Sequence, residues 1–304
     1  VFKILFSSVH SQNFDQAVAE KELLASFEKT RQLYYLLLSL PVELANYAQS
    51  RIYIGLNKYQ PTDEEINPNL RFVNNKAITI LEKDKALVKA REHGLNWALH
   101  KGYIKKLYEQ FRKEPYFIEY MNAPQEPGFA EDLKLLQDFF SDQPEDDPDL
   151  YTLLEDQSLY WADDIAYVCN IILAQLAGMK EGKDMPAHPS LFNNQEDKDF
   201  ATELLAHSLA HYKEFVGYIE KFAQNWDLER IAATDTILIV MGVAESVAFP
   251  QIPVKVTLNE IVEISKYYST DNSKMFVNGI LDKIIKHLVQ EGIIAKRGRG
   301  LVEK

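Results

Sequence analysis

One predicted helix near the carboxyl end contains an aromatic ring, a side-chain amide and a glycine within four residues, at Phe276, Asn278 and Gly279. An exposed ring at Phe276 would stack on an unpaired base, although a phenylalanine at helical spacing also packs in a core. Glycine inside a helix costs about 1 kcal/mol relative to alanine, and asparagine is also unfavourable there, so another role must favour both residues. We expect Gly279 to permit close contact between helices. Asn278 either presents its amide to a ligand or bonds to the neighbouring helix.

Three lysines, Lys255, Lys266 and Lys274, lie in the same part of the chain. Their ammonium groups would contact phosphates, although isolated exposed lysines are commonly only solvated. Residues 296–300, with the sequence KRGRG, form a basic, glycine-rich tail that either touches nucleic acid or remains an inert terminus. Together, these residue types favour recognition of an anion over covalent chemistry.

Groups suited to catalysis are weakly represented. Glu203, His207 and His211 could share one helix face as metal ligands, but the zincin pattern needs a glutamate directly after the first histidine, where this chain has a serine. The neighbouring acids Asp163 and Asp164 point to different faces of a helix, so solvation explains them better than paired catalysis. The sequence contains no glycine-rich phosphate loop, nucleophile elbow or cysteine pair. We therefore expect a binding protein and not an enzyme, without a cofactor or a metal.

The elements that must position these residues are helices. Apolar residues recur at helical spacing almost throughout the chain, which predicts an all-α fold made of helical bundles. Prolines and turn formers predict connections at 56–68 and 182–194 and a surface excursion at 123–148. Before residue 230, the pattern predicts helices or helical regions over 1–9, 14–29, 31–55, 76–120, 129–140, 150–178 and 200–226.

Three further helices are predicted near the carboxyl end. The first runs over 234–249 with Thr234 as its N-cap, and Pro250 and Pro253 end it. The second spans about 257–267, and the third follows turn and capping residues at 269–272. Short connections between three helices predict a compact bundle.

Charge is distributed unevenly along the chain. The net charge of −12 argues against a partner that is a polyanion, because phosphate contacts need Lys and Arg. From Trp226 onward, however, ten basic residues balance ten acidic ones, whereas 126–156 hold eleven acids and one base, Lys134. The acidity therefore does not exclude nucleic-acid binding near the carboxyl end.

A single cysteine, Cys169, cannot form an internal disulfide, and its apolar neighbours predict a buried thiol. The longest apolar stretch, 165–177, is shorter than the roughly 20 residues needed to cross a bilayer. No segment resembling a signal peptide opens the sequence. We expect a cytoplasmic protein without a membrane partner.

About the last quarter of the chain resembles the NusB family. The segment WDLERIAATD at 226–235 resembles the start of that family's C-terminal domain, and IPVKVTLNE at 252–260 resembles the start of its next helix. The segment FVNGILDK at 276–283 matches the family signature FVNGxLDK nearly letter for letter. A thinner match lies in the aromatic and apolar pattern of 1–12.

This resemblance implies an RNA-binding transcription antitermination factor. Such a protein pairs with NusE, a small-subunit ribosomal protein, on single-stranded boxA-like RNA of ribosomal operons, within the RNA polymerase antitermination complex. Recognition of unstacked bases needs aromatic platforms, amide edges and cations. The implied RNA-binding residues are Lys255, Lys266, Lys274, Phe276 and Asn278.

Partner contacts in the family map onto Phe6, Asp235 and Asn272. Each also has an ordinary structural interpretation, as a core aromatic, a helix-start acid and a cap. The chain departs from the family at Val240, where arginine is frequent, and at Asn272, where aspartate is frequent. At these two positions the side-chain chemistry therefore differs from the one that is frequent in the family.

The expected organisation is a helical N-terminal domain over 1–225, with a large insertion at about 51–195, followed by a NusB-like C-terminal bundle with a basic tail over 226–304. An alternative function is a helical protein–protein scaffold of the same fold that has lost RNA recognition and docks partners on its acidic segment. A third possibility, an RNA-modifying enzyme that carries a NusB-like module, lacks a Rossmann-type cofactor loop.

Overall fold

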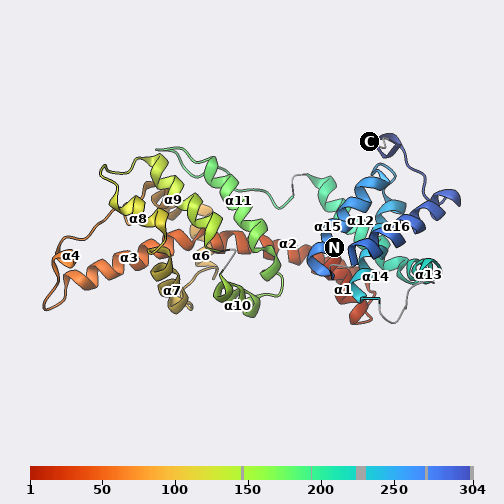
Figure 1. Cartoon of the computed structure of the whole chain (residues 1–304), viewed down its shortest axis with the longest axis horizontal. Helices are drawn as coiled ribbons and strands as arrows, with labels where there is room; N and C mark the ends of the chain where they lie inside the picture. The colour runs from red at the N-terminus through yellow and green to blue at the C-terminus, as the bar shows by residue number, and fades with distance from the viewer. Residues whose placement is uncertain (145–146, 193, 224–230, 271–272, 302–304) are drawn as a thin grey trace. The chain divides into compact units, whose positions relative to one another are not determined.

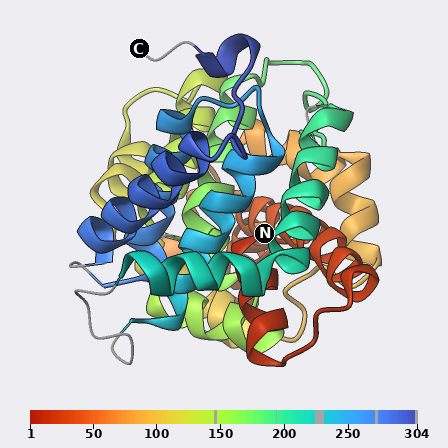
Figure 2. The same cartoon turned by 90° about the vertical axis from the view of Figure 1, so that its right-hand side faces the viewer.

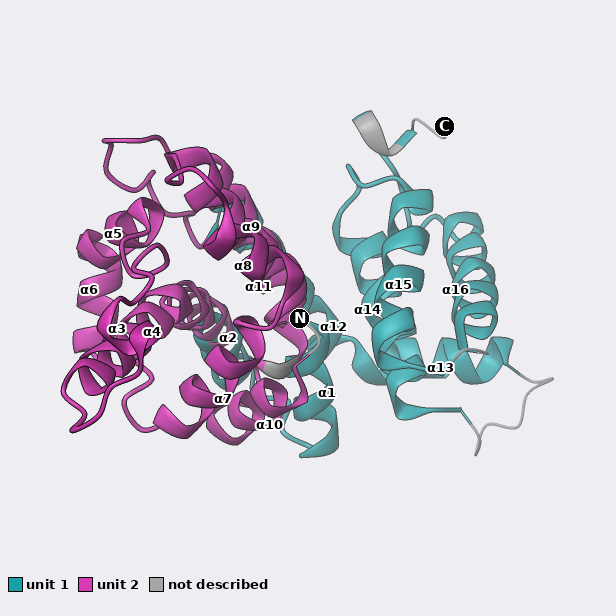
Figure 3. Cartoon of the chain, turned by 60° about the vertical axis from the view of Figure 1, so that its left-hand side comes forward, with its two compact units in different colours: residues 1–25, 192–304 teal, residues 26–191 magenta. Residues whose placement is uncertain are grey.

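The computed structural model describes residues 1–144, 147–192, 194–223, 231–270 and 273–301. Within these ranges the chain is helical and contains no strand, which confirms the all-α prediction (Figure 1). None of the described helices is both long and apolar enough to cross a membrane. The chain divides into two compact units, residues 1–25 with 192–304 (unit 1) and residues 26–191 (unit 2), which are coloured separately in Figure 3.

Unit 2 is formed by the middle of the chain. It takes the second part of α2 (Gln16–Leu38), in which the division between the units falls, and all helices up to the turn after α11. These are α3 (Leu40–Leu56), α4 (Asp63–Ile66), α5 (Lys76–Lys83), α6 (Lys85–Glu92), α7 (Lys101–Phe111), α8 (Pro115–Asn122), α9 (Phe129–Asp142), α10 (Pro148–Gln157), η1 (Ala162–Asp164) and α11 (Ile165–Ala177).

Aromatic side chains fill much of the core of unit 2. Phe111 meets Phe72, Phe117 and Phe139 edge-on, with ring centroids 4.6–5.6 Å apart. Edge-to-face packing of this kind stabilises a pair beyond the area that it buries. Cys169 is buried in the same core, as predicted.

The segment 123–148 is not the surface excursion that its prolines and acids predicted. It contains α9, whose Leu135, Leu136, Phe139 and Phe140 are each no more than 2% exposed. The apolar face of this helix supplies part of the core of unit 2, while Glu131, Lys134 and Asp142 are exposed.

Unit 1 is assembled from both ends of the sequence. It combines α1 (Phe2–His10) and the start of α2 with α12 (Gln195–Ala210), α13 (Tyr212–Phe222), α14 (Ala233–Ala248), α15 (Val254–Tyr268), α16 (Ser273–Gln290) and η3 (Gly298–Leu301). Helix α14 is central, since residues 237–246 are all buried and α1, α12, α13, α15 and α16 pack against it. Figure 2 shows the chain from a second direction, with α15 and α16 in blue.

The expected domain boundary lies at 225, and the expected insertion spans about 51–195. The two units instead divide the chain after residue 25 and after residue 191. Helices α1 and α12 contact each other and α14, so residues expected in a separate N-terminal domain share a unit with the C-terminal bundle. The insertion interpretation agrees with a middle segment that forms its own core, but this segment starts at Ser26, within α2.

Helix boundaries differ from the prediction where a proline or a local turn decides them. The expected break near Thr30 is absent, and α2 instead continues to Leu38, because Pro41 lacks the N–H that a continuous helix needs there. The single helix expected over 200–226 is two helices that meet at His211, and residues 224–226 lie outside the described ranges.

Candidate nucleic-acid interface

Gly242 of α14 lies in close contact with α15 and α16, whereas Gly279 does not lie in such a contact. A Cβ atom at Gly242 would lie 2.6 Å from Leu281 Cδ2 on α16 and 3.1 Å from Ile261 Cγ1 on α15. A Cβ atom at Gly279 would meet nothing within 4 Å. The expected helix-packing role of Gly279 is therefore wrong, and Gly242 has that role instead.

One end of unit 1 collects most of the predicted contact residues. There, the Ser269 hydroxyl donates a hydrogen bond to Asp235 in the first turn of α14, which ties the start of α14 to the end of α15. Phe2 on α1 packs against Tyr268 of α15, with ring centroids 4.6 Å apart. The start of α1, the start of α14, the end of α15 and the start of α16 thus meet around the α15–α16 turn.

The three predicted partner residues differ in their surroundings at this end. Phe6 is half-buried, one turn after Phe2, and its ring stacks on His10 with centroids 5.8 Å apart. Asp235 is only 4% exposed and is engaged with Ser269, so it acts as a helix-start acid that fastens two helices. Asn272 lies outside the described residues.

Two of the predicted lysines flank the α15–α16 turn. Lys266 stands in the last turn of α15 and pairs with Glu263, while Lys274 is half-buried in the first turn of α16. Asn278 is exposed one helical turn after Lys274, on the same face of α16. An amide edge and two ammonium groups therefore lie at one end of the bundle.

Phe276 does not join them. Its ring is 5% exposed and belongs to the buried face of α16 together with Val277 and Ile280, so it offers no surface on which a base could stack. The aromatic side chain available at this end is Tyr267, which is 83% exposed and follows Lys266 directly. The signal for it lies in the helical spacing, since residue 267 falls off the face of α15 that carries the buried Ile261.

Lys255 is separated from the other lysines. It is exposed in the first turn of α15, eleven residues before Lys266 and thus about 16 Å away along the helix. The basic tail lies at this other end, because the Arg297 amide donates to the Pro250 carbonyl (2.9 Å) and Lys296 Nζ donates to the Phe249 carbonyl (3.1 Å). This part of the tail is therefore attached to the α14–α15 connection.

A buried acid and a partly buried base also meet near the tail. Burial raises the pKa of Glu245, which is 7% exposed, and burial lowers the pKa of Lys296, while the attraction between the two charges opposes both shifts. Lys296 therefore interacts with the charge of Glu245 and with the Phe249 carbonyl.

Glu203, His207 and His211 do not converge on one point where they could bind a metal ion. His207 Nε2 lies 4.0 Å from Glu203, whereas His211 Nδ1 is 2.9 Å from Glu214, and the two imidazole rings stack. Among the described residues, no group of three or more His, Cys, Asp or Glu side chains could hold a metal ion.

Comparison with known proteins identifies one domain. The NusB family matches residues 172–286, a range that begins in α11 and ends in α16. No solved structure matches the chain.

Curated relatives match a similar length of the chain. Proteins named transcription antitermination protein NusB are 43% identical over 105 residues in Salinibacter ruber, 40% over 106 in Chloroherpeton thalassium and 38% over 93 in Methylacidiphilum infernorum. The matches cover 34%, 35% and 31% of this chain and 66%, 50% and 65% of the respective relatives. The chain thus spans between half and just under two thirds of the length of these relatives.

Proposed function

Because this chain belongs to the NusB family through residues 172–286, we propose that it is an RNA-binding transcription antitermination factor. The observation that carries this proposal is the identity of 38–43% to proteins named for that activity, together with the family match at 172–286, most of which lies in unit 1. The protein acts by binding and not by catalysis. Its RNA is single-stranded and boxA-like, and its partner is NusE, within the antitermination complex of RNA polymerase.

The proposed RNA surface lies at the α15–α16 end of unit 1. Lys266 and Lys274 would neutralise phosphates, Asn278 would bond to a base edge, and Tyr267 would provide the stacking platform that Phe276 does not. Lys255 would contact a more distant phosphate of the same strand. Phe6, half-buried on α1, and Asn272, which lies outside the described residues, would contact NusE.

A gel-shift titration with boxA RNA, with and without NusE, tests this proposal. Binding should be selective for boxA over a scrambled RNA, should weaken as salt is added, and should strengthen when NusE is present. Lys274→Glu combined with Asn278→Ala should weaken binding, whereas Lys213→Glu on α13, exposed in the same unit, should not. Equal affinity for boxA and scrambled RNA, with no enhancement by NusE, would contradict the proposal.

A scaffold function is supported by a groove on unit 2. This groove, with a volume of about 330 Å³, is lined by Glu119, Glu126, Glu131 and Asp138, with Lys134 already paired to Asp138 at 2.8 Å. Such a surface suits a basic segment of a partner protein. Deleting the acidic segment would not test this, because α9 supplies core residues.

Neutralising substitutions test the scaffold function without removing α9. Glu126→Gln with Glu131→Gln should abolish capture of a basic peptide and leave the affinity for boxA RNA unchanged. If the double variant binds a basic peptide as well as the unmodified protein does, this second function is excluded.

A further inference from the structure

A second groove on unit 2 lies between α2 and α6. Its volume is about 520 Å³, within the range of ligand sites. Two alanines of α6, Ala86 and Ala90, stand one turn apart on its lining and leave room that larger side chains would fill. The other lining residues are Glu28, Arg31, Gln32, Tyr35, Lys89, His93, Gly94 and Leu95.

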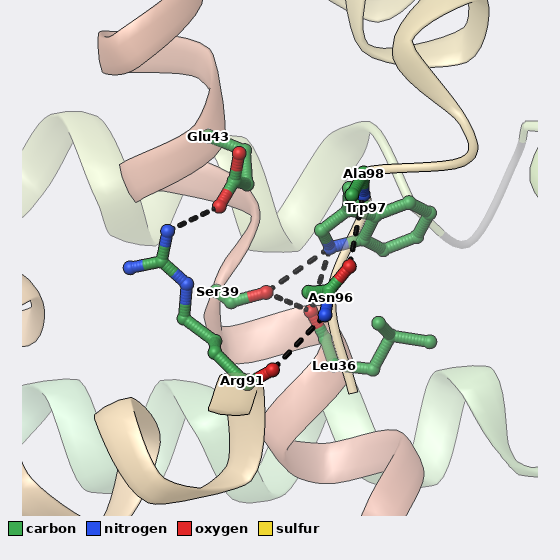
Figure 4. Close-up of polar contacts among 7 residues, drawn as sticks. All are labelled: Leu36, Ser39, Glu43, Arg91, Asn96, Trp97 and Ala98. Atoms are coloured by element: carbon green, nitrogen blue, oxygen red, sulfur yellow. Dashed lines mark hydrogen bonds and ion pairs between the residues drawn. The ribbon is translucent and has the colours of Figure 1, made fainter. Parts of the chain in front are cut away.

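Residues next to the lining in sequence connect α6 and the segment after it to the α2–α3 junction by polar contacts (Figure 4). The buried Trp97 indole donates hydrogen bonds to the Leu36 carbonyl (3.1 Å) and to Ser39 Oγ (3.0 Å), at the junction of α2 and α3. Arg91, at the end of α6, pairs with Glu43 of α3 at 2.6 Å. These contacts hold the end of α6 and the segment after it against the α2–α3 junction, so the groove exists before any ligand arrives.

The charge of this groove is opposite to that of the protein. Arg31 and Lys89 are exposed on its two sides, and the lining contains a single acid, Glu28, which Arg31 already pairs with at 2.7 Å. Lys89 forms no ion pair with any residue in the described part of the chain. The surrounding segment 76–113 holds ten basic and four acidic residues, in contrast to the acidic segment that follows it.

Groups that bind bases accompany these cations. Tyr35 is half-buried and contributes a ring, and the Gln32 side chain contributes an amide. His93 Nδ1 lies 2.7 Å from the Lys89 carbonyl, which can only accept, so this nitrogen donates and the Nε2 edge of the ring remains for a ligand. Cations beside aromatic rings and an amide are the combination with which proteins hold single-stranded nucleic acid. An acidic peptide would use only the cations.

We propose that the α2–α6 groove binds the sugar-phosphate backbone and a base of single-stranded RNA, as a second contact outside the NusB-family core. Lys89 and Arg31 contact phosphates, and Tyr35 and His93 flank a base. This inference rests on the proposed function for the presence of an RNA partner. The site itself is supported by the presence of the α2–α6 groove without a ligand and by its local excess of positive charge.

Fluorescence anisotropy with the full chain tests the groove, using a boxA-length RNA and the same RNA extended by an oligouridine tail. The unmodified protein should bind the extended RNA more tightly. Lys89→Glu should weaken binding of the extended RNA roughly tenfold and make its salt dependence shallower by about 0.7 for each phosphate that the variant no longer neutralises. Binding of the short RNA should stay the same.

Lys183→Glu is the matched control, because it makes the same charge change at an exposed lysine of the same unit outside the groove. The groove proposal is overturned if both variants lose the same affinity, or if the extended RNA binds no more tightly than the short one. It is also overturned if an oligoglutamate peptide, and not RNA, shows the dependence on Lys89. Selective binding of short boxA RNA tests the proposed function separately, since that result does not depend on Lys89. Absence of all RNA binding would overturn both.

Discussion

At Gly242, a single hydrogen atom stands where any other residue would place a carbon. Leu281 and Ile261, which occupy the space beside it, are themselves buried at 0% and 1% exposure, so neither can move into solvent. The contact among α14, α15 and α16 therefore depends on this one position.

Gly242→Ala and Gly279→Ala form a matched pair for measuring that contact. Gly279→Ala should stabilise unit 1 by up to about 1 kcal/mol, because alanine is the better helix former and its Cβ meets nothing. Gly242→Ala gains the same preference but must displace Leu281, at a cost of about 1–3 kcal/mol. Urea denaturation should therefore give a lower free energy of unfolding for Gly242→Ala than for Gly279→Ala. Equal values would show that the core adapts freely.

Asp132 provides a pH-dependent contribution in unit 2. Its side chain is 1% exposed and accepts hydrogen bonds from the Tyr120 hydroxyl (2.6 Å) and the Lys76 amide (2.8 Å), yet burial outweighs these bonds and raises its pKa above the ordinary 3.8. The folded protein therefore keeps a proton on Asp132 at a pH where the unfolded chain has lost it. This contribution is fully present below about pH 4 and is lost as the pH rises through the raised pKa.

Asp132→Asn should remove this contribution. The asparagine keeps an acceptor for one of the two donors and does not ionise, so the variant gains in free energy of unfolding relative to the unmodified protein as the pH rises from 4 to 7. Denaturation of both proteins at several pH values measures that difference. A difference that does not change with pH would contradict the assignment.

At the level of elements, the end of unit 1 depends on the bond between Ser269 and Asp235. Asp235→Ala should lower the free energy of unfolding by about 1–3 kcal/mol, since the Ser269 hydroxyl loses its charged acceptor and α14 loses a favourable acid in its first turn. Asp235→Asn keeps an acceptor and should lose less. Denaturation of both variants checks the order, and a larger loss for Asp235→Asn would argue against this role of the bond.

The helical pattern predicted the class of these elements and the presence of the three C-terminal helices, although α14 begins at Ala233 and Thr234 is not its N-cap. The pattern failed where tertiary contacts decide. Residues 27–33 contain no Gly, Pro, Asn, Asp or Ser, and the Glu28–Arg31 pair supports a helix there, so the break lies at Ser39, before Pro41. Gly279 and Gly242 look alike in the sequence, because only the neighbouring helices distinguish them. Phe276 is ambiguous between platform and core for the same reason.

At the level of the whole molecule, the core cluster of unit 2 consists only of residues between Leu33 and Met179. A unit with its own core can unfold on its own, and two-state behaviour of the entire chain is then not expected. Charges of opposite sign are also separated along unit 2, which contains both the acidic segment 126–156 and the basic segment 76–113.

Calorimetry should therefore resolve two thermal transitions. Phe139→Ala removes a ring from the core of unit 2, which costs about 3–5 kcal/mol, and should lower the temperature of one transition only. Leu281→Ala in unit 1 should lower the temperature of the other transition only. A single transition that both substitutions shift equally would show that the two units unfold together.

Unit 1 requires residues from both sides of unit 2, and this sets an order in time. During synthesis, the apolar side chains of α1 emerge before α14, against which they pack, and the 166 residues of 26–191 alone delay α14. At about 5–20 residues per second, that delay is roughly 8–33 s, long enough for unit 2 to fold while α1 has no partner. Ribosome-bound chains in which all of residues 26–191 have left the ribosome should accordingly contain a finished unit 2 and an unpacked α1 that chaperones can bind.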